Sequence, residues 1–179
     1  KVAKAIEGGT QFVGLSDFTA FQLALLAKTG AISWAGPALG EDFGVEGEPD
    51  DIMEACFDDL VQDQGEGAGW RLPLPPRRKT PELIAEPDRS ATGSGQKAIK
   101  NAVLWGGNLS VLVSLLGTPY WPQVQGGVLF IEDVNEHPFR IERMLTQLLH
   151  AGGLARQRAI GCGQFTGIRL APHDKGYRL

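Results

Sequence analysis

Ser16 is the first residue whose type and position could perform chemistry. It stands in the tetrapeptide Gly14-Leu15-Ser16-Asp17, between an expected strand and an expected helix. Ligands of α/β proteins bind at the carboxyl ends of parallel strands, where such a serine would lie. On a tight turn its hydroxyl could act as a nucleophile, while the N–H of Asp17 faces a developing oxyanion. Serine is also a preferred helix cap, and the tetrapeptide alone favours that simpler role, since Phe18 stands where a Gly-x-Ser-x-Gly motif requires glycine.

Two acids, Glu132 and Asp133, end the apolar run of residues 128–131. Acids at the end of a buried strand point toward a cleft, where a carboxylate could orient a histidine that activates a serine. They could equally be structural acids that pair with Arg140 or Arg143, or that cap the helix that follows them. Taken alone, the position of the two acids favours the structural role.

A paired glycine, Gly106-Gly107, precedes Asn108 and is expected to open a helix. Such a turn allows a close backbone approach and could bind an anion or an amide. A simple asparagine cap is the commoner explanation. The segment lacks the Gly-Lys-Ser/Thr ending of a phosphate-binding Walker loop.

The three histidines are His137, His150 and His173. None has a second ligand at metal-binding spacing, so we predict no metal site, and no cofactor is expected. His150 falls in the last turn of an expected helix, where a cation complements the helix dipole. His137 precedes Pro138 and is expected to be an exposed turn residue.

The composition excludes several classes of function. The chain has 179 residues, 42% hydrophobic and 21% charged, which is ordinary for a soluble globular protein. A formal net charge of -4 argues against nucleic acid as a partner. The two cysteines, Cys56 and Cys162, predict neither a disulfide framework nor a metal site, and they fit a reducing, cytosolic setting. No apolar run is long enough to span a bilayer, and no signal peptide is visible.

The elements that must position these residues follow from local patterns. Residues 11–15 predict a buried strand, 17–28 a helix closed by Gly30, and 31–35 a second strand, which together form a parallel βαβ unit. An amphipathic helix is expected at 50–62. Further along, we expect a helix at 108–116, a strand at 127–134, a helix at 139–150 started by Pro138, and a strand at 158–165. Between these two groups, residues 65–99 are rich in proline and glycine and predict a linker or lid.

The order of these motifs resembles that of the LD-carboxypeptidases, the serine peptidase family of muramoyltetrapeptide carboxypeptidases that includes the microcin-immunity peptidases. The resemblance rests on the conjunction of Gly-x-Ser-Asp at 14–17, Gly-Pro at 36–37, Gly-Gly-Asn-Leu-Ser at 106–110, Gly-Thr at 117–118, Ile-Glu-Asp at 131–133 and Arg-x-x-Arg-Met-Leu at 140–145. It covers most of the chain apart from the proline-rich segment.

The resemblance implies an α/β fold with a Rossmann-like, incomplete parallel-sheet part joined to a second, smaller α/β or β-rich domain. Residues 1–64 would be the C-terminal portion of the nucleophile-bearing domain, and 100–179 the N-terminal portion of the domain that carries the triad acid. It also implies a Ser-Glu-His triad, with Ser16 as the nucleophile, Glu132 as the acid and the Asp17 amide as an oxyanion donor. Gly107 and Asn108 would contact the substrate.

The implied activity is removal of the terminal D-alanine from muropeptide tetrapeptides, in the cytoplasmic recycling of peptidoglycan, by a homodimer. Two features depart from the family pattern. The family's histidine falls beyond Leu179, and a glycine-rich turn that donates the second oxyanion amide falls before Lys1, so the chain is expected to be the middle of a larger enzyme. His173 does not match the family's histidine.

Two other functions remain open on the sequence. A microcin-immunity type of peptidase would cleave a peptide or aminoacyl-nucleotide conjugate instead of a muropeptide. A non-catalytic α/β ligand-binding module would keep the fold without a working triad.

Overall fold

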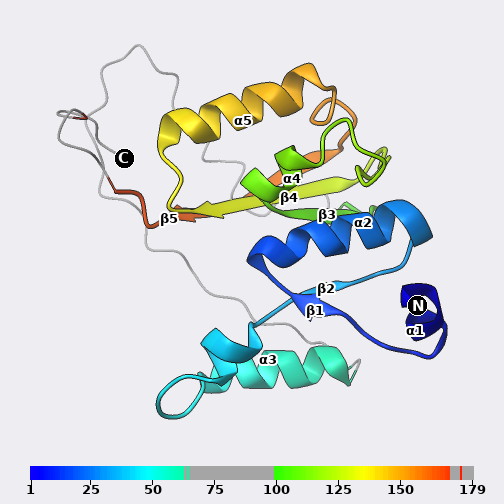
Figure 1. Cartoon of the computed structure of the whole chain (residues 1–179), viewed down its shortest axis with the longest axis vertical. Helices are drawn as coiled ribbons and strands as arrows, with labels where there is room; N and C mark the ends of the chain where they lie inside the picture. Colours follow the sequence, from blue (N-terminus) through cyan, green and yellow to red (C-terminus); the bar gives the residue numbers. More distant parts are fainter. Residues whose placement is uncertain (63, 65–98, 170–173, 175–179) are drawn as a thin grey trace.

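A computed structural model describes residues 1–62, 64, 99–169 and 174 of the chain (Figure 1). The predicted linker or lid at 65–99 lies, apart from residue 99, outside the described residues, and so does His173.

The first part of the chain contains the expected parallel βαβ unit. Helix α1 (Val2–Glu7) is followed by β1 (Val13–Gly14), the short 3-10 helix η1 (Ser16–Phe18), α2 (Thr19–Thr29) and β2 (Trp34–Ala35). β1 and β2 pair in parallel and are shorter than the five residues expected for each. α2 ends at Gly30, which has a left-handed φ of 70° that favours glycine. The π-helix η2 (Leu39–Phe43) was not expected, whereas α3 (Asp51–Val61) confirms the helix predicted at 50–62.

The second part is a three-stranded parallel sheet with the order β3-β4-β5. Its elements are β3 (Leu104–Asn108), α4 (Leu109–Ser114), β4 (Val128–Val134), α5 (Pro138–His150) and β5 (Ala159–Thr166). The helices and strands expected at 127–134, 139–150 and 158–165 are confirmed within one or two residues. Parallel strands joined by helices confirm the α/β class.

Strand β3 corrects the sequence prediction. Gly106 and Gly107 do not open a helix: they lie inside β3, and the helix begins only at Leu109. A Cβ on Gly106 would lie 1.9 Å from the carbonyl oxygen of Phe130 on β4. Both positions are therefore glycine because β3 lies very close to its neighbours. The requirement comes from tertiary contacts and not from the start of a helix.

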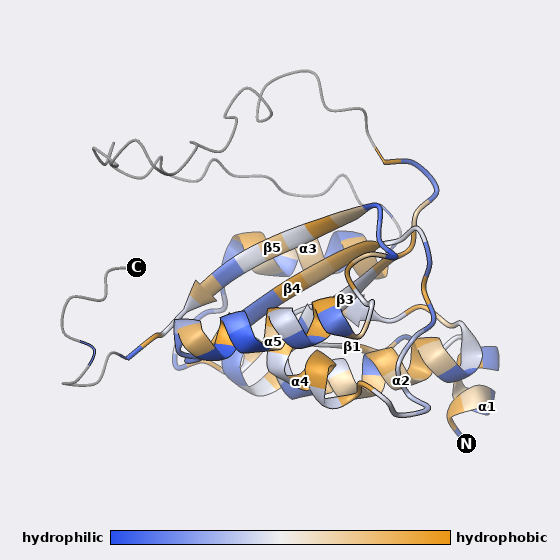
Figure 2. Cartoon of the chain, turned by 90° about the horizontal axis from the view of Figure 1, so that it is seen from above, coloured by the Kyte–Doolittle hydropathy of each residue, from blue (hydrophilic) through white to orange (hydrophobic). Residues whose placement is uncertain are grey.

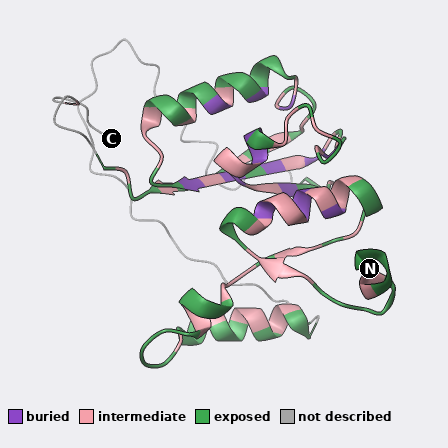
Figure 3. Ribbon diagram, in the orientation of Figure 1, coloured by how far each residue is buried: buried purple, intermediate pink, exposed green. Residues whose placement is uncertain are grey.

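One hydrophobic core joins both parts of the chain. The buried side chains lie on α2, β3, α4, β4 and α5 (Figure 3): Leu23, Trp105, Leu109, Leu112, Val113, Leu129, Ile131, Met144 and Leu148. Leu23 on α2 belongs to this cluster, so α2 packs against β3 and α4. The Gln22 Nε2 on the same helix donates to Gly14 O at 3.3 Å and to Trp34 O at 2.8 Å, which ties α2 to β1 and β2 as well.

Strand β4 changes character along its length. It is hydrophobic at its start and hydrophilic toward its carboxyl end, where Glu132 and Asp133 lie (Figure 2). Leu129 and Ile131 are buried against the helices, and Asp133 is buried with them at 3% exposure. In the described part of the chain, no helix combines the length and the apolar character that crossing a membrane requires.

Candidate active site

Ser16 is the first residue of η1 and occupies a strained turn directly after β1. Its φ is 59°, in the left-handed region that residues with a side chain seldom adopt. Such a conformation costs about 1–3 kcal/mol and persists where the surrounding structure imposes it. The N-cap residues of η1 and α2 are Leu15 and Phe18, so Ser16 is the N-cap of neither helix and the simple capping interpretation is wrong. The side chain of Ser16 is exposed.

The turn is held from both sides. The ring of Phe18 packs on Gly14, where an added Cβ would lie 2.4 Å from the nearest ring carbon. Gln22 donates to the carbonyl oxygen of Gly14, at the end of β1. The N–H of Phe18 donates to Leu15 O at 3.1 Å and closes the turn around the serine. A strand, a left-handed serine and a helix in succession are the local structure of a nucleophile elbow.

Glu132 and Asp133 point to different surroundings at the end of β4. Asp133 Oδ2 accepts from Ser110 N at 2.9 Å, and its Oδ1 accepts from Asn108 Nδ2 at 3.3 Å and from Val134 N at 2.8 Å. Asp133 is thus a buried structural acid that binds the first turn of α4. The structural interpretation holds for it, but with partners other than those expected.

Arg140, one of the arginines proposed as a partner, has a different partner. Arg140 pairs with Glu136 through Nε and Oε2 at 2.7 Å, and the helix that Asp133 binds precedes it in the sequence instead of following it.

Glu132 is half-buried and has a perturbed carboxyl group. Burial raises the pKa of Glu132, the charge of Asp133 raises it further, and a hydrogen bond from the side chain of Asn108 lowers it. In the sheet, Glu132 is the register partner of Asn108 on β3. A carboxyl group of raised pKa at the carboxyl end of a strand is typical of functional sites, though ion-pair networks also produce such shifts.

Asn108 joins the acids to the start of α4. Its Oδ1 accepts from Val111 N at 3.1 Å and from Ser110 Oγ at 2.8 Å, which confirms the asparagine cap. Its Nδ2 donates to Asp133 Oδ1, and Glu132 lies beside it as its register partner on β4. The residue is 8% exposed. These three hydrogen bonds hold the amide in one orientation at the end of β3.

Two residues at this site were missed in the sequence. Thr19 is 1% exposed, and its Oγ1 accepts from the backbone N–H of Asn108 at 3.1 Å. Gln22, at 9% exposure, bridges the ends of β1 and β2. The sequence did offer one signal for both residues: they are polar and stand three positions apart in a helix that is otherwise apolar nearly all round. A polar side chain buried in such a helix needs a hydrogen-bond partner, which predicts a contact at this site.

His137 is not an exposed turn residue. Its side chain is 15% exposed, and its Nε2 lies 3.3 Å from Asp174 Oδ1. Its Nδ1 accepts from Phe139 N at 3.4 Å, so the residue caps α5 ahead of Pro138. Both ring nitrogens therefore have contacts that give His137 a structural role at the start of α5.

The structure brings some of the predicted site residues together. Glu132, Asn108 and Asp133 meet at the ends of β3 and β4, and η1, which carries Ser16 and Asp17, contacts β3. Within the described residues no hydrogen bond joins the Ser16 side chain to Glu132. In a triad a histidine lies between these two groups, so a direct bond is not required. The same part of the chain holds no group of three His, Cys, Asp or Glu side chains that could bind a metal ion.

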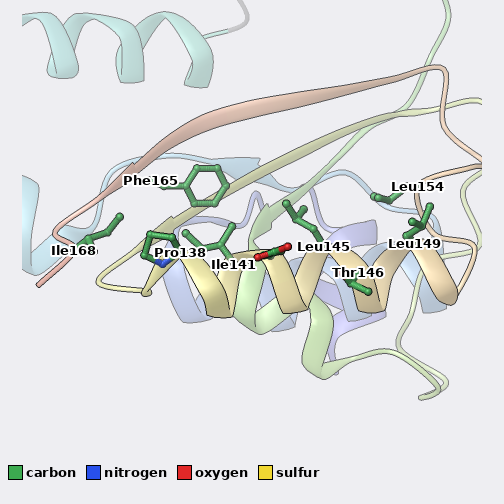
Figure 4. Close-up of a pocket in the computed structure, with 9 residues that line it drawn as sticks. Pro138, Ile141, Leu145, Thr146, Leu149, Leu154, Phe165 and Ile168 are labelled. Atoms are coloured by element: carbon green, nitrogen blue, oxygen red, sulfur yellow. The ribbon is translucent and has the colours of Figure 1, made fainter. Parts of the chain in front are cut away.

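A groove lies apart from these residues, between α5 and β5 (Figure 4). It has a volume of about 470 Å³, and its lining residues come from α5, β5 and the segments next to them: Pro138, Ile141, Glu142, Leu145, Thr146, Leu149, Leu154, Phe165 and Ile168. The lining is mainly apolar and contains neither Ser16 nor Glu132. It therefore contains neither member of the proposed serine–acid pair and is not the candidate active site.

Comparisons with known proteins show which proteins the chain is similar to. A family model described as the LD-carboxypeptidase C-terminal domain matches residues 101–178. The probable murein peptide carboxypeptidase of Bacillus subtilis is 33% identical over 147 residues, which cover 80% of this chain and 39% of that protein. The microcin C7 self-immunity protein of Escherichia coli is 30% identical over 149 residues, which cover 76% of this chain and 42% of that protein.

Among solved structures, the muramoyltetrapeptide carboxypeptidase of Oxalobacter formigenes superimposes with a TM-score of 0.71 at 36% identity. The match covers 99% of this chain and 54% of that one. The chain thus spans about half the length of this structure and about two fifths of the length of the two curated relatives.

Proposed function

Since the chain belongs to the LD-carboxypeptidase family, we propose that the whole protein is a serine-type LD-carboxypeptidase that releases the terminal D-alanine from muropeptide tetrapeptides. The names of two relatives, a murein peptide carboxypeptidase and a muramoyltetrapeptide carboxypeptidase, support a peptide of the cell wall as the substrate. Peptidoglycan recycling in the cytoplasm, a homodimeric assembly and the division into domains at 1–64 and 100–179 are further parts of this proposal.

The observation that carries the proposal is the conformation of Ser16. A non-glycine residue with a φ of 59°, exposed between a strand and a helix, holds its hydroxyl out of the backbone toward solvent. Strain of this kind concentrates at active sites, where it presents a reacting group. The N–H of Asp17 follows directly and is the proposed oxyanion donor.

In the proposed reaction, Ser16 Oγ attacks the carbonyl carbon before the terminal D-residue, and its proton passes to the histidine of the triad that the family implies. The tetrahedral oxyanion is stabilised by backbone N–H groups, including that of Asp17. The intermediate collapses, D-alanine leaves with the proton, and water hydrolyses the ester on Ser16. Glu132 holds and charge-stabilises the histidine as it becomes an imidazolium. Gly107 and Asn108 border the site and are proposed to contact the substrate.

The test is release of D-alanine from a muropeptide tetrapeptide by the full-length protein. Ser16→Ala should abolish turnover and leave the fold intact, because the side chain is exposed. Ser114→Ala is a matched control: this serine is also exposed, and its Oγ donates only to Val111 O within α4, so it should retain full activity. Release of D-alanine by Ser16→Ala at the wild-type rate would refute the assignment.

A parallel assay with an aminoacyl-nucleotide analogue addresses the other peptidase function, which the microcin C7 self-immunity relative supports. Turnover of the analogue without turnover of the muropeptide would replace the proposed substrate. Turnover of neither, together with no labelling of Ser16 by an active-site serine probe, would favour a non-catalytic ligand-binding module.

A further inference from the structure

Thr19 connects the segment that carries the nucleophile to the segment that carries the acid. It is the first residue of α2, three positions after Ser16, and it is 1% exposed. Its Oγ1 accepts from the N–H of Asn108 at 3.1 Å, across 89 positions of sequence. A buried backbone N–H needs an acceptor, and here a side chain from the other half of the chain supplies it.

The backbone of β3 is shaped for this contact. Gly107 has a φ of 135°, and a Cβ at this position would lie 2.6 Å from Thr19 Oγ1 and 3.0 Å from Thr19 Cγ2. Only glycine allows the threonine to approach this closely. The start of α2 thus contacts the end of β3 through both close packing and a hydrogen bond.

The contact continues from the backbone of Asn108 to its side chain. The same residue that donates its N–H to Thr19 donates its side-chain Nδ2 to Asp133, and it is the register partner of Glu132 on β4. Hydrogen bonds therefore link the residue next to the η1 turn to Asn108 and Asp133, beside the proposed triad acid Glu132 at the end of β4. Thr29, at the other end of α2, bonds only within its own helix end, to Leu25 O and Ala31 N.

We propose that Thr19 is a positioning residue, which sets the placement of Ser16 relative to Glu132 through the N–H of Asn108. This inference rests on the proposed serine peptidase function. A triad requires its members to be held within about 0.5 Å of the productive geometry. A displacement of about 1 Å by a change outside the chemistry can cost about 100-fold in rate. The Thr19 hydroxyl therefore fixes the position of the segment that carries Ser16 relative to the strands that carry Asn108 and Glu132.

The experiment measures kcat and KM for D-alanine release by the full-length protein. Thr19→Val keeps the shape of the side chain but removes the acceptor, and it should lower kcat by about 10- to 100-fold with a change in KM of less than about threefold. Thr19→Ser keeps the acceptor and should restore most of the lost kcat. Thr29→Val removes a threonine hydroxyl from the same helix and should match the wild type.

The outcomes separate the two proposals. No release by the wild type would refute the proposed function itself. Release by the wild type with an unchanged kcat in Thr19→Val would refute the positioning role alone, and so would a rise in KM without a fall in kcat. If Thr19→Val does not fold, Thr19→Ser and Thr19→Cys are compared, because they are close in size and differ in the strength of the acceptor. Equal kcat values for these two variants would overturn the inference.

Discussion

Gly106→Ala should be among the most destabilising single changes in the second sheet. The added Cβ would lie 1.9 Å from Phe130 O, so β3 and β4 would have to separate by about 1 Å to reach even a 3.0 Å contact. A hydrogen bond stretched by that amount is lost. Two or three lost ladder bonds at about 1 kcal/mol each, together with about 1–3 kcal/mol for a side chain at a φ of 123°, give about 3–6 kcal/mol.

The assay is urea unfolding followed by tryptophan fluorescence. Trp105 is the neighbour of Gly106 in β3, is 5% exposed and packs edge-on against Trp121 at 5.4 Å between ring centroids, so its emission should report on this strand. In thermal unfolding, the same change should lower Tm by about 10 °C or more.

Gly117→Ala separates the steric clash from the backbone strain. Gly117 also has a positive φ, 77°, but nothing lies within 4 Å of an added Cβ. Alanine there should cost only about 1–2 kcal/mol, the penalty of the left-handed conformation. If the two variants unfold within about 1 kcal/mol of each other, the close approach of β3 to Phe130 is not what requires glycine at position 106.

Two further changes test the core and the acid. Leu148→Ala removes a side chain that is 0% exposed and should lower the free energy of unfolding by about 2–5 kcal/mol, whereas Leu149→Ala, 57% exposed on the same helix, should change it by less than about 1 kcal/mol in urea unfolding. Glu132→Gln removes a carboxyl group whose pKa is raised in the folded state. In the wild type, the protonated carboxyl group contributes to stability below the unfolded pKa of 4.5. That contribution is lost as the pH rises through the folded pKa. The Tm of Glu132→Gln should therefore rise relative to wild type as the pH is raised above 4.5. A constant or falling difference would contradict the burial of Glu132 as the main cause of the shift.

Glu132 illustrates a cost that active sites commonly carry. A half-buried carboxylate beside the charge of Asp133 is unfavourable for folding at neutral pH, and only the Asn108 amide offsets it among the causes of the shift. The left-handed conformation of Ser16 is unfavourable in the same way. Both residues belong to the proposed triad. Gln22, which has no proposed part in the chemistry, holds the serine turn, and Asp133 holds the Asn108 amide that lies beside Glu132.

Local patterns in the sequence determined the elements and their order. Pro138 and the apolar face of 141–149 were enough to predict α5, because helix initiation and amphipathic packing depend on residues within a few turns. The run Val128–Ile131 predicted β4, and the conjunction of short motifs indicated the family. Ser16 and Glu132 could be named as candidates for the same reason: each stands at the end of a recognisable strand.

Only the tertiary structure decided what surrounds those candidates. Gly106 and Gly107 looked like a helix start, and they are strand residues because Phe130 O and the Thr19 side chain leave no room for a Cβ. Asp133 is bonded to Asn108 and to the first turn of α4, and not to Arg140. These partners are 25 and 23 positions away in the sequence, so local patterns did not indicate them. The role of Thr19 depends on a residue 89 positions away. Contacts between residues so distant in sequence leave no periodic signal in the chain, and only folding brings them together.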